Sequence, residues 1–340
     1  EKEVVLLHGI TSSGKTEVYT KLIEANLKSG KQILFLLPEI ALTTQIISRL
    51  ENYFGNQISV FHSKYSMNER VEVWNNVLNN KPKAQIILGA RSSIFLPFSN
   101  LGLIIVDEEH ETSYKQFEPS PRYHARDTAV VLAHQHKAKI LLGSATPSLE
   151  SYFNTQNGKY GLVELNRRFG NVLLPKIELI DIKEKQRKKK MTGHFSDRLL
   201  EMIVEALKNK EQVILFQNRR GFSPVVECTT CGVAPQCPNC DVSLTFHKYR
   251  SELKCHYCNY QRAMPNSCTA CGSNTLDTKG FGTEQIELEL KKLFPEHVIG
   301  RMDLDTTRGK HGYQKIIGAF EDREIDVLVG TQMLSKGLDF

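Results

Sequence analysis

One eight-residue segment constrains the fold of this chain more than any other feature. Its sequence, Gly9-Ile10-Thr11-Ser12-Ser13-Gly14-Lys15-Thr16, fits the pattern G-x-x-x-x-G-K-[ST]. An apolar run over residues 4–8 precedes it and an amphipathic stretch over 15–28 follows, so it lies between an expected strand and an expected helix. In that setting the eight residues surround the phosphates of a nucleotide, with Lys15 neutralising charge and the Thr16 hydroxyl binding Mg²⁺. We therefore expect an ATP site here rather than a chance glycine-rich turn.

Strand-length apolar runs alternate with amphipathic stretches along the first part of the chain. Expected strands cover 4–8, 33–37, 85–88, 103–106 and 140–142, and expected helices cover 15–28 and 42–54. This alternation predicts an α/β fold with a doubly wound, largely parallel sheet over residues 1–155. A second series begins near residue 160, with helices over 196–208 and 284–293 and strands over 212–216 and 325–329. It predicts a second α/β lobe formed by 160–227 and 272–340.

Acidic residues follow one of the expected strands directly. The run 103–106 ends in Asp107-Glu108-Glu109-His110, where Asp107 would hold Mg²⁺ through water and Glu108 would polarise the attacking water. Gly143-Ser144-Ala145-Thr146-Pro147 follows another strand, and its hydroxyls are suited to sensing the γ-phosphate, although alone it would be a plain turn. In this order the three segments indicate the first motor lobe of a superfamily 2 helicase. Its catalytic residues would be Lys15, Asp107 and Glu108.

All eight cysteines of the chain fall within residues 228–271, in four C-x-x-C pairs. They are Cys228, Cys231, Cys237, Cys240, Cys255, Cys258, Cys268 and Cys271. Eight thiolates can form two closed Cys₄ zinc sites, which would be structural because no ligand position is left open. Spacing alone allows nested, sequential or interleaved pairing. Clustering in a chain without a secretory signal favours metal binding over disulfides, so we expect a zinc-binding insertion in the second lobe.

Composition excludes several other classes of protein. Of the 340 residues, 40% are hydrophobic and 24% are charged, which is typical of a globular protein rather than a disordered or fibrous one. The longest apolar runs have strand length, so we expect no membrane association and a cytoplasmic location. The net charge of +6 is compatible with a polyanionic partner. Because the chain opens at Glu1 and enters a strand at once, we interpret it as a piece of a longer protein.

Together these features resemble one family, the bacterial replication-restart helicases of the PriA type. The resemblance covers essentially the whole chain, and a C-x-x-C array inside the second lobe makes it specific. Two residues depart from the family's usual pattern, because Ser12 stands where glycine is usual and Ala90 where threonine is usual. Besides the segments above, the matching stretches are Gly14-Lys15-Thr16-Glu17-Val18-Tyr19, Leu37-Pro38-Glu39-Ile40-Ala41-Leu42, Arg91-Ser92-Ser93-Ile94-Phe95, Ser113-Tyr114-Lys115-Gln116, Arg122-Tyr123-His124-Ala125-Arg126-Asp127, Asn218-Arg219-Arg220-Gly221-Phe222, Gly282-Thr283-Glu284 and Gly330-Thr331-Gln332-Met333.

The resemblance implies two RecA-like lobes that form an ATP-dependent 3′–5′ DNA helicase. Such a protein recognises stalled or repaired replication forks and initiates primosome assembly. Its partners would be branched and single-stranded DNA, primosome proteins and single-strand DNA-binding protein, at the nucleoid. The implied zinc pairing is nested, with the outer four cysteines on one ion and the inner four on the other. The family's DNA-binding regions and its motif VI arginines are expected outside residues 1–340, so this chain should bind nucleotide and zinc better than it turns over ATP.

Aromatic and basic residues alternate just past the acidic segment. Aromatic faces stack on unpaired bases and cations contact phosphates, so this stretch is expected to sense single-stranded DNA beside the ATP site. The alternative is that Phe117 or Tyr123 merely packs the loop. The basic run 183–190 would contact DNA or form a solvated linker, and Trp74 is expected in a helix core. The expected DNA-contacting or coupling residues are Tyr114, Lys115, Phe117, Arg122, Tyr123 and, farther along the chain, Lys336.

Two other functions fit the same residues. One is a zinc-bearing DNA-binding and primosome-loading scaffold that needs no ATP hydrolysis. The other is a translocase that moves along duplex DNA without unwinding it.

Overall fold

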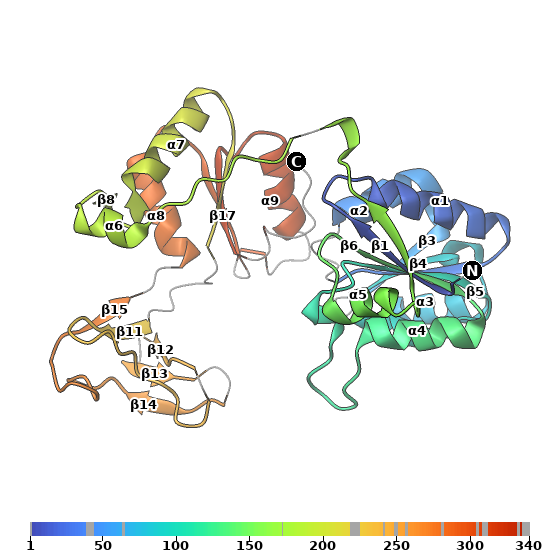
Figure 1. Ribbon diagram of the computed structural model, residues 1–340, viewed down its shortest axis with the longest axis horizontal. Coiled ribbons are helices and arrows are strands. Elements are labelled where there is room, and N and C mark those ends of the chain that lie inside the picture. Colours follow the sequence, from blue (N-terminus) through green and yellow to red (C-terminus); the bar gives the residue numbers. More distant parts are fainter. Residues whose placement is uncertain are drawn as a thin grey trace. The chain divides into compact units, whose positions relative to one another are not determined.

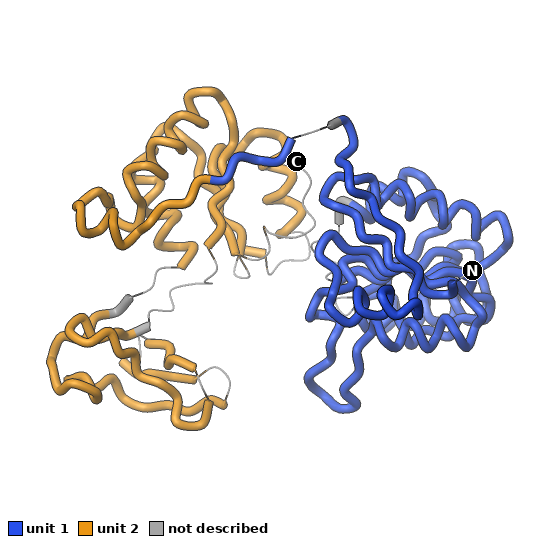
Figure 2. Tube along the Cα trace, viewed as in Figure 1, with its two compact units in different colours: residues 1–177, 339 blue, residues 178–338, 340 orange. Residues whose placement is uncertain are grey.

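The chain folds into two compact units in the computed structural model. The structure describes residues 2–38, 44–62, 65–171, 173–217, 225–240, 242–247, 251–255, 258–279, 282–303, 306–307, 312–331 and 334. Contacts along the chain divide it after Ile177 into two compact units (Figure 2). Lys336 and the matching stretches over 39–42, 218–222 and 332–333 lie outside the described residues.

The first unit is a seven-stranded parallel sheet with helices on both faces (Figure 1). The strand order is β3-β4-β2-β5-β6-β1-β7. The strands are β1 (Val4–Gly9), β2 (Gln32–Leu36), β3 (Ile58–Phe61), β4 (Ile86–Gly89), β5 (Leu101–Asp107), β6 (Lys139–Ser144) and β7 (Gly161–Leu165). The helices are α1 (Lys15–Lys28), α2 (Thr44–Phe54), α3 (Met67–Leu78), α4 (Ala125–His136) and α5 (Leu149–Gln156).

Central strands of this sheet are buried on both faces, as their continuous apolar runs require. Every residue of β2 is buried, and successive residues contribute to opposite cores. Leu34 and Leu36 pack in the core that α3 and α4 cover, whereas Ile33 and Phe35 pack in the core that α1 and α2 cover. The doubly wound fold predicted for this part of the chain is confirmed.

Three neighbouring strands position the predicted site. β5, β6 and β1 lie side by side and are parallel, so their carboxyl ends meet at one edge of the sheet. The phosphate loop follows β1, the acidic segment ends β5, and the segment from Gly143 to Pro147 ends β6. Ligands of open parallel sheets bind at such an edge, where loops and helix N-termini gather.

The division between the units differs from the boundary expected from the sequence. β7 pairs in parallel with β1, with Val5 opposite Gly161, and extends the first sheet beyond residue 155. The apolar alternation of 161–165 suits a strand in either lobe, so the pattern did not say which sheet it would join. Contacts place the change of unit at Ile177.

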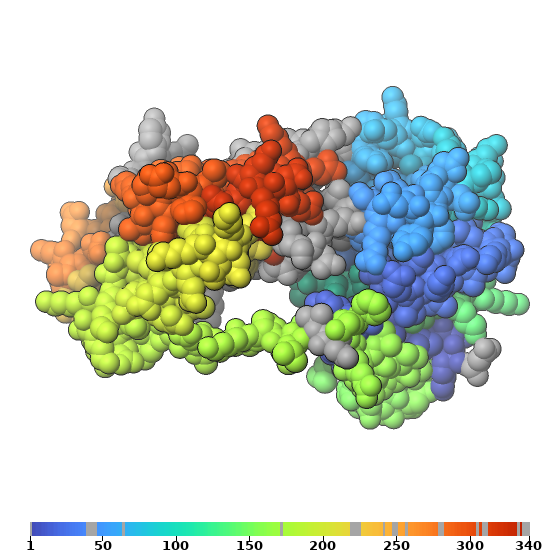
Figure 3. Space-filling model, turned by 90° about the horizontal axis from the view of Figure 1, so that it is seen from above, coloured from blue at the N-terminus to red at the C-terminus, as the bar shows by residue number. Residues whose placement is uncertain are grey.

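The second unit contains a three-stranded parallel sheet and a cysteine-rich part. The sheet has the order β10-β17-β16, formed by β10 (Val213–Phe216), β17 (Val327–Gly330) and β16 (Ile299–Met302). Figure 3 shows the surface of α7 (Asp197–Lys208), in yellow, bordering that of described residues between 283 and 330, in orange and red. The helices are α6 (Ile182–Arg187), α7 (Asp197–Lys208), α8 (Thr283–Leu293) and α9 (Gly312–Glu321), and a short hairpin joins β8 (Met191–Thr192) to β9 (Phe195–Ser196).

The cysteine-rich part has its own antiparallel sheet, of order β14-β13-β12-β11-β15. Among the described residues its buried apolar cluster is small, with Val226, Leu244 and Leu253 packed beside Cys237 and Cys255. So little apolar burial cannot hold a fold of this size without cross-links or metal. The strands are β11 (Val225–Cys228), β12 (Thr245–His247), β13 (Glu252–Lys254), β14 (Gln261–Ala263) and β15 (Leu276–Lys279).

Two smaller sequence expectations have clear structural outcomes. Trp74 was expected in the core, but 43% of it is exposed on α3, so that expectation is wrong. The basic run 183–190 is partly helical, and Lys185 pairs with Asp197 of α7. Among the described helices, none is both long and apolar enough to cross a bilayer.

Candidate nucleotide site and cysteine clusters

The loop between β1 and α1 is shaped to receive an anion. Gly14 precedes the helix with a φ of 89°, a conformation that side chains disfavour. No described side chain caps this end of α1, so its first N–H groups are left for another acceptor. The Lys15 ammonium donates to the Gly9 carbonyl at 2.8 Å, and Ser13 Oγ is buried with no hydrogen-bond partner among the described residues. Both groups lie in the loop and fit the phosphates of a nucleotide.

The acidic segment faces this loop. Asp107 ends β5, and its Oδ1 accepts a hydrogen bond of 2.8 Å from the Tyr19 hydroxyl of α1. Burial raises the pKa of Asp107, while the Tyr19 hydrogen bond and the charge of Lys15 oppose that rise. Burial and then the charge of Asp107 raise the pKa of Glu108 to about 7. A carboxyl group with that pKa can accept a proton from water near neutral pH.

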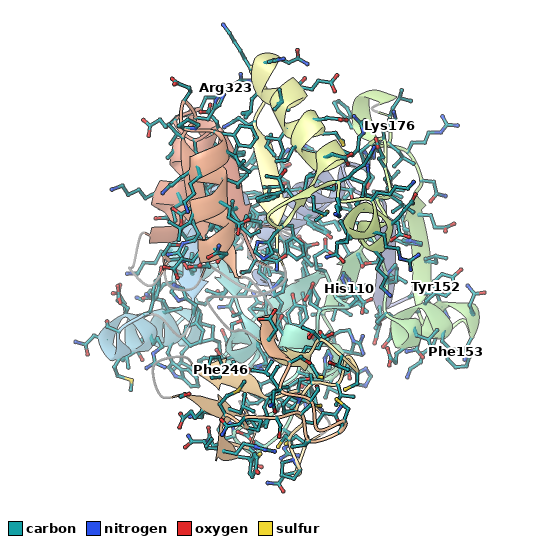
Figure 4. All side chains as sticks on the ribbon, turned by 90° about the vertical axis from the view of Figure 1, so that its left-hand side faces the viewer. His110, Tyr152, Phe153, Lys176, Phe246 and Arg323 are labelled. Atoms are coloured by element: carbon teal, nitrogen blue, oxygen red, sulfur yellow. The ribbon has the colours of Figure 1, made fainter. Side chains whose placement is uncertain are left out.

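Residues after β6 contact the acidic segment directly. Nδ1 of His110, which Figure 4 labels, lies 2.8 Å from Ser144 Oγ, and its Nε2 lies 3.4 Å from Thr146 Oγ1. The Thr146 N–H donates to Ser144 Oγ at 2.9 Å. A Cβ at Gly143 would lie 1.8 Å from the Tyr19 hydroxyl, so only glycine allows this close approach. The structure therefore brings the phosphate loop, the acids and the segment after β6 into one site.

The stretch expected to contact DNA is an ordered loop that leaves this site. The Arg91 guanidinium donates to the Lys115 carbonyl at 2.7 Å, and a β-bridge joins Lys115 to His124. Phe117 is 65% exposed and Arg122 is exposed as well, so both are available to a ligand. Tyr123 is half-buried and packs edge-on against Phe95, with 4.8 Å between ring centroids. Tyr123 also packs against the apolar core of the first unit, so only part of its ring is open to a ligand.

Tyr114 has a different role from the one the sequence suggested. It is fully buried, and its hydroxyl lies 2.7 Å from the Asp107 carbonyl oxygen and 3.0 Å from that of Leu36. A side chain in this position cannot stack on a base, so the expectation of a DNA contact at Tyr114 is corrected. Its position beneath Asp107 makes it part of the support of the acidic segment.

The eight thiols form two clusters of four. One contains Cys228, Cys231, Cys268 and Cys271, and the other contains Cys237, Cys240, Cys255 and Cys258. In each cluster all Sγ atoms lie within 4.8 Å of one another. This is the nested arrangement that the resemblance implied and that spacing left open.

The distances within the clusters suit tetrahedral zinc. Sγ atoms lie 3.6 Å apart in the pairs Cys228/Cys271 and Cys231/Cys268. A disulfide needs about 2.05 Å, whereas four sulfurs each about 2.3 Å from one ion are roughly 3.8 Å apart. Burial, followed by the neighbouring thiols, raises the pKa of Cys240 to about 12. A cation between the sulfurs would favour their ionised forms, so the donor set fits Zn²⁺.

Comparisons with known proteins agree with both parts of the site. The profile of the "DEAD/DEAH box helicase" family matches residues 1–154, and that of the "PriA DNA helicase Cys-rich region (CRR) domain" matches residues 237–262. The "Replication restart protein PriA" of Bacillus subtilis is 45% identical over 340 residues, which cover 100% of this chain and 42% of that protein. The protein of the same name from Haemophilus influenzae is 45% identical over 99% of this chain and 45% of its own length. The chain belongs to the PriA family.

This PriA-family chain also shares the helicase fold of more distant proteins. The structure of RecG bound to a three-way DNA junction matches with a TM-score of 0.50 and 15% identity, covering 97% of this chain and 33% of RecG. Saccharomyces cerevisiae Dbp5 bound to RNA and ADP BeF3 matches with a TM-score of 0.51 and 11% identity, and the match covers 98% of this chain and 67% of Dbp5. The predicted fold class, RecA-like α/β with a cysteine-rich insertion, is confirmed. The chain spans less than half the length of the two PriA relatives above.

Several residues of this PriA site have no obvious signature in the sequence. Tyr19 lies 88 residues from Asp107, and Arg126 lies 17 residues from its partner Glu109. A local motif cannot pair residues that far apart. The matching stretches that contain Tyr19 and Arg126 were the only indication that either residue matters.

Proposed function

We propose that this chain is the ATP-driven motor of a 3′–5′ DNA helicase that acts at stalled or repaired replication forks and initiates primosome assembly. One observation carries the proposal: Lys15, Asp107 and Glu108 gather at three adjacent strand ends, where His110 contacts Ser144. The name of the relatives, replication restart protein, supports the role at forks.

The residues present fit ATP and Mg²⁺. The loop from Gly9 to Thr16 would hold the phosphates, with Lys15 against their charge. Mg²⁺ would be held by Thr16 and, through water, by Asp107, and when bound it would neutralise charge on the β- and γ-phosphates. Glu108 would hold the proton that the attacking water loses. His110 would pass the state of the γ-phosphate to the hydroxyls of Ser144 and Thr146.

DNA would meet the exposed loop beside this site. Phe117 and Tyr123 offer ring faces or edges to unpaired bases, and Lys115 and Arg122 offer charge to phosphates. Branched and single-stranded DNA are the proposed substrates in the cytoplasm at the nucleoid, with primosome proteins and single-strand DNA-binding protein as partners. Lys336 remains a proposed contact by resemblance. The two Cys₄ clusters would each hold one structural Zn²⁺.

Nucleotide binding is the first test of this proposal. Titration calorimetry with a non-hydrolysable ATP analogue and Mg²⁺ should detect binding to the 340-residue chain. Lys15→Ala should weaken it about 10- to 100-fold, the cost of losing hydrogen bonds from a charged group. The matched control is Lys21→Ala on the same helix, because Lys21 pairs only with exposed Glu24 in the described ion pairs. Equal affinities for both variants would contradict the assigned site.

Unwinding is the second test, made in a protein that supplies the flanking regions of the Bacillus subtilis relative. Forked duplex should be separated with ATP, and Lys15→Ala should abolish this separation. A primosome-loading scaffold would still load its partners with Lys15→Ala. A duplex translocase would hydrolyse ATP on blunt duplex without separating the fork. Either result would replace the proposed activity.

A further inference from the structure

Among the described acids of the first unit, Glu109 is the most deeply buried, and the proposed chemistry does not use it. It is fully buried. Its Oε1 accepts a hydrogen bond of 2.6 Å from the Ser148 N–H. Its Oε2 accepts bonds from Ser148 Oγ at 2.9 Å, Ser151 Oγ at 2.8 Å and Arg126 Nη1 at 3.0 Å. A buried carboxylate with four donors holds those donors in fixed places.

Arg126 is buried with it. The guanidinium reaches three acceptors, because Nη1 also contacts Ser148 Oγ at 2.6 Å and Nε contacts Asp127 Oδ1 at 2.8 Å. Removing either member of a buried ion pair leaves the other charge uncompensated, so the two positions are strongly dependent on each other. Lysine could carry the charge but could not reach these acceptors from one planar group.

The order of segments along the chain shows which parts of the unit this ion pair joins. The exposed loop leaves the acidic segment after His110 and returns at Ala125, the first residue of α4. Glu109 therefore stands just before the loop and Arg126 just after it, so their contact closes the base of the loop. Ser148 is the N-cap of α5 and directly follows the segment that contacts His110. One carboxylate thus joins the loop, the acidic segment and the residues after β6.

Hydrogen bonds brace the loop from its base towards its tip. The Gln116 N–H donates to the Tyr123 carbonyl at 2.8 Å, next to the bridge between Lys115 and His124. The Gln116 side chain donates to the carbonyls of Pro119 at 2.9 Å and Pro121 at 3.0 Å. A cross-braced hairpin moves as one piece when its tip is engaged.

We propose that Glu109, Arg126, Ser148 and Ser151 form a buried clasp that couples occupancy of the loop by DNA to the nucleotide site. The four residues are positioning residues, since they touch neither ligand. The inference rests on the proposed function, because it presupposes that the chain binds both nucleotide and DNA. It concerns which contacts carry the coupling between those two sites.

The clasp predicts a thermodynamic coupling that can be measured without ATP turnover. Fluorescence anisotropy of a labelled single-stranded oligonucleotide gives its Kd with and without the non-hydrolysable ATP analogue and Mg²⁺. The ratio of the two Kd values is the coupling factor, and allosteric proteins show about 5- to 150-fold. The nucleotide Kd measured with and without oligonucleotide must change by the same factor.

Arg126→Lys is the main variant. We expect its coupling factor to fall to within about twofold of one, while each ligand alone binds within about threefold of the wild type. Val77→Ala is the matched control, because Val77 is fully buried in α3 outside the clasp and its loss lowers stability without touching Glu109. That control should keep the wild-type coupling factor. A wild-type factor in a folded Arg126→Lys would overturn the clasp.

Ser151→Ala covers the case in which Arg126→Lys does not fold. It removes one of the four hydrogen bonds to Glu109 and leaves the buried ion pair intact. The coupling factor should fall at least threefold, and an unchanged factor would overturn the inference. A wild type that binds both ligands without coupling would overturn the clasp alone. A wild type that binds no nucleotide or no DNA would overturn the proposed function and the clasp with it.

Discussion

The Tyr19 hydroxyl donates a hydrogen bond of 2.8 Å to Oδ1 of Asp107, across 88 residues of sequence. Tyr19 is fully buried and Asp107 is partly buried, and the contact joins the helix of the phosphate loop to the acidic end of β5. Because the bond favours the ionised carboxylate, it opposes the rise in the pKa of Asp107 that burial causes. The geometry of the magnesium ligand thus depends on a residue that touches no ligand in our proposal.

Tyr19→Phe tests this dependence. The variant keeps the ring that packs edge-on against Phe35 at 5.4 Å and loses only the hydroxyl. The pKa of Asp107 should rise further, so Mg²⁺-dependent binding of the ATP analogue should weaken about tenfold at neutral pH. As the pH is lowered, the loss of this binding should also begin at a higher pH than in the wild type. Calorimetry over a pH series measures both effects, and unchanged binding with Mg²⁺ would contradict the prediction.

The raised pKa of Glu108 predicts that hydrolysis depends on pH. Its pKa is raised to about 7, first by burial and then by the charge of Asp107, and a base must be deprotonated to act. The kcat/KM for ATP should therefore fall as the pH drops through about 7. This profile requires a version of the protein that hydrolyses ATP.

Glu108→Gln is the control for that profile. It removes the titrating group, so the remaining activity should be at least 100-fold lower and should lose the limb near pH 7. An acid limb near pH 4.5 in the wild type would assign the base role to another group.

Contiguous patterns predicted much of the fold and the site. The phosphate loop, the acids and the segment after β6 each occupy a few consecutive residues, and parallel strands bring their ends together by rule. The cysteine pairing needed more than spacing, because chelation by two-residue gaps permits several arrangements. The resemblance implied the nested one, and the cluster of Cys228 with Cys271 has that arrangement.

Side-chain placement was less predictable, for physical reasons that differ between residues. Val73 and Val77, four residues apart, define the buried face of α3, and Trp74 lies one position around the helix, where it is 43% exposed. Tyr114 is of a residue type that often contacts DNA, but it fills the space beneath Asp107. Glu108 and Glu109 are adjacent residues of the same type, yet in the described ion pairs only Glu109 pairs with Arg126. Tertiary contacts decide such cases, and no local pattern contains them.

In the outer cysteine cluster, a hydroxyl that is not itself a zinc ligand should help the thiols to retain the ion. Ser273 Oγ lies 3.1 Å from the sulfur of Cys228 and 3.2 Å from that of Cys271. Contacts of this kind typically change metal affinity 10- to 100-fold. Ser273→Ala should therefore release one of two zinc ions about tenfold faster to a chromophoric chelator, while the release of the other is unchanged.

Thr229→Val is the matched control for zinc release. Its hydroxyl bonds the carbonyl of Thr275 rather than a thiol, so both release phases should keep their wild-type rates. Native mass spectrometry should count two zinc ions in each variant before the chelator is added. Equal acceleration of both phases in Ser273→Ala would mean general destabilisation and would contradict a local role.

Ser12 sits in the phosphate loop with a φ of 61°, where glycine is favoured and other residues are strained. Ser12→Gly should relieve this strain and stabilise the first unit by up to about 1 kcal/mol, or ~2–4 °C in Tm. Affinity for the ATP analogue should stay within about twofold of the wild type. Differential scanning calorimetry and titration measure the two quantities.

Gly14→Ala gives the opposite case in the same loop. Gly14 has a φ of 89°, and a Cβ there would meet nothing within 4 Å, so backbone strain alone should lower stability by about 1 kcal/mol. Opposite shifts in Tm for the two variants would establish that the loop is held in left-handed conformations at both positions. A lower Tm for Ser12→Gly would instead mean that the serine side chain contributes more to the loop than its conformation costs.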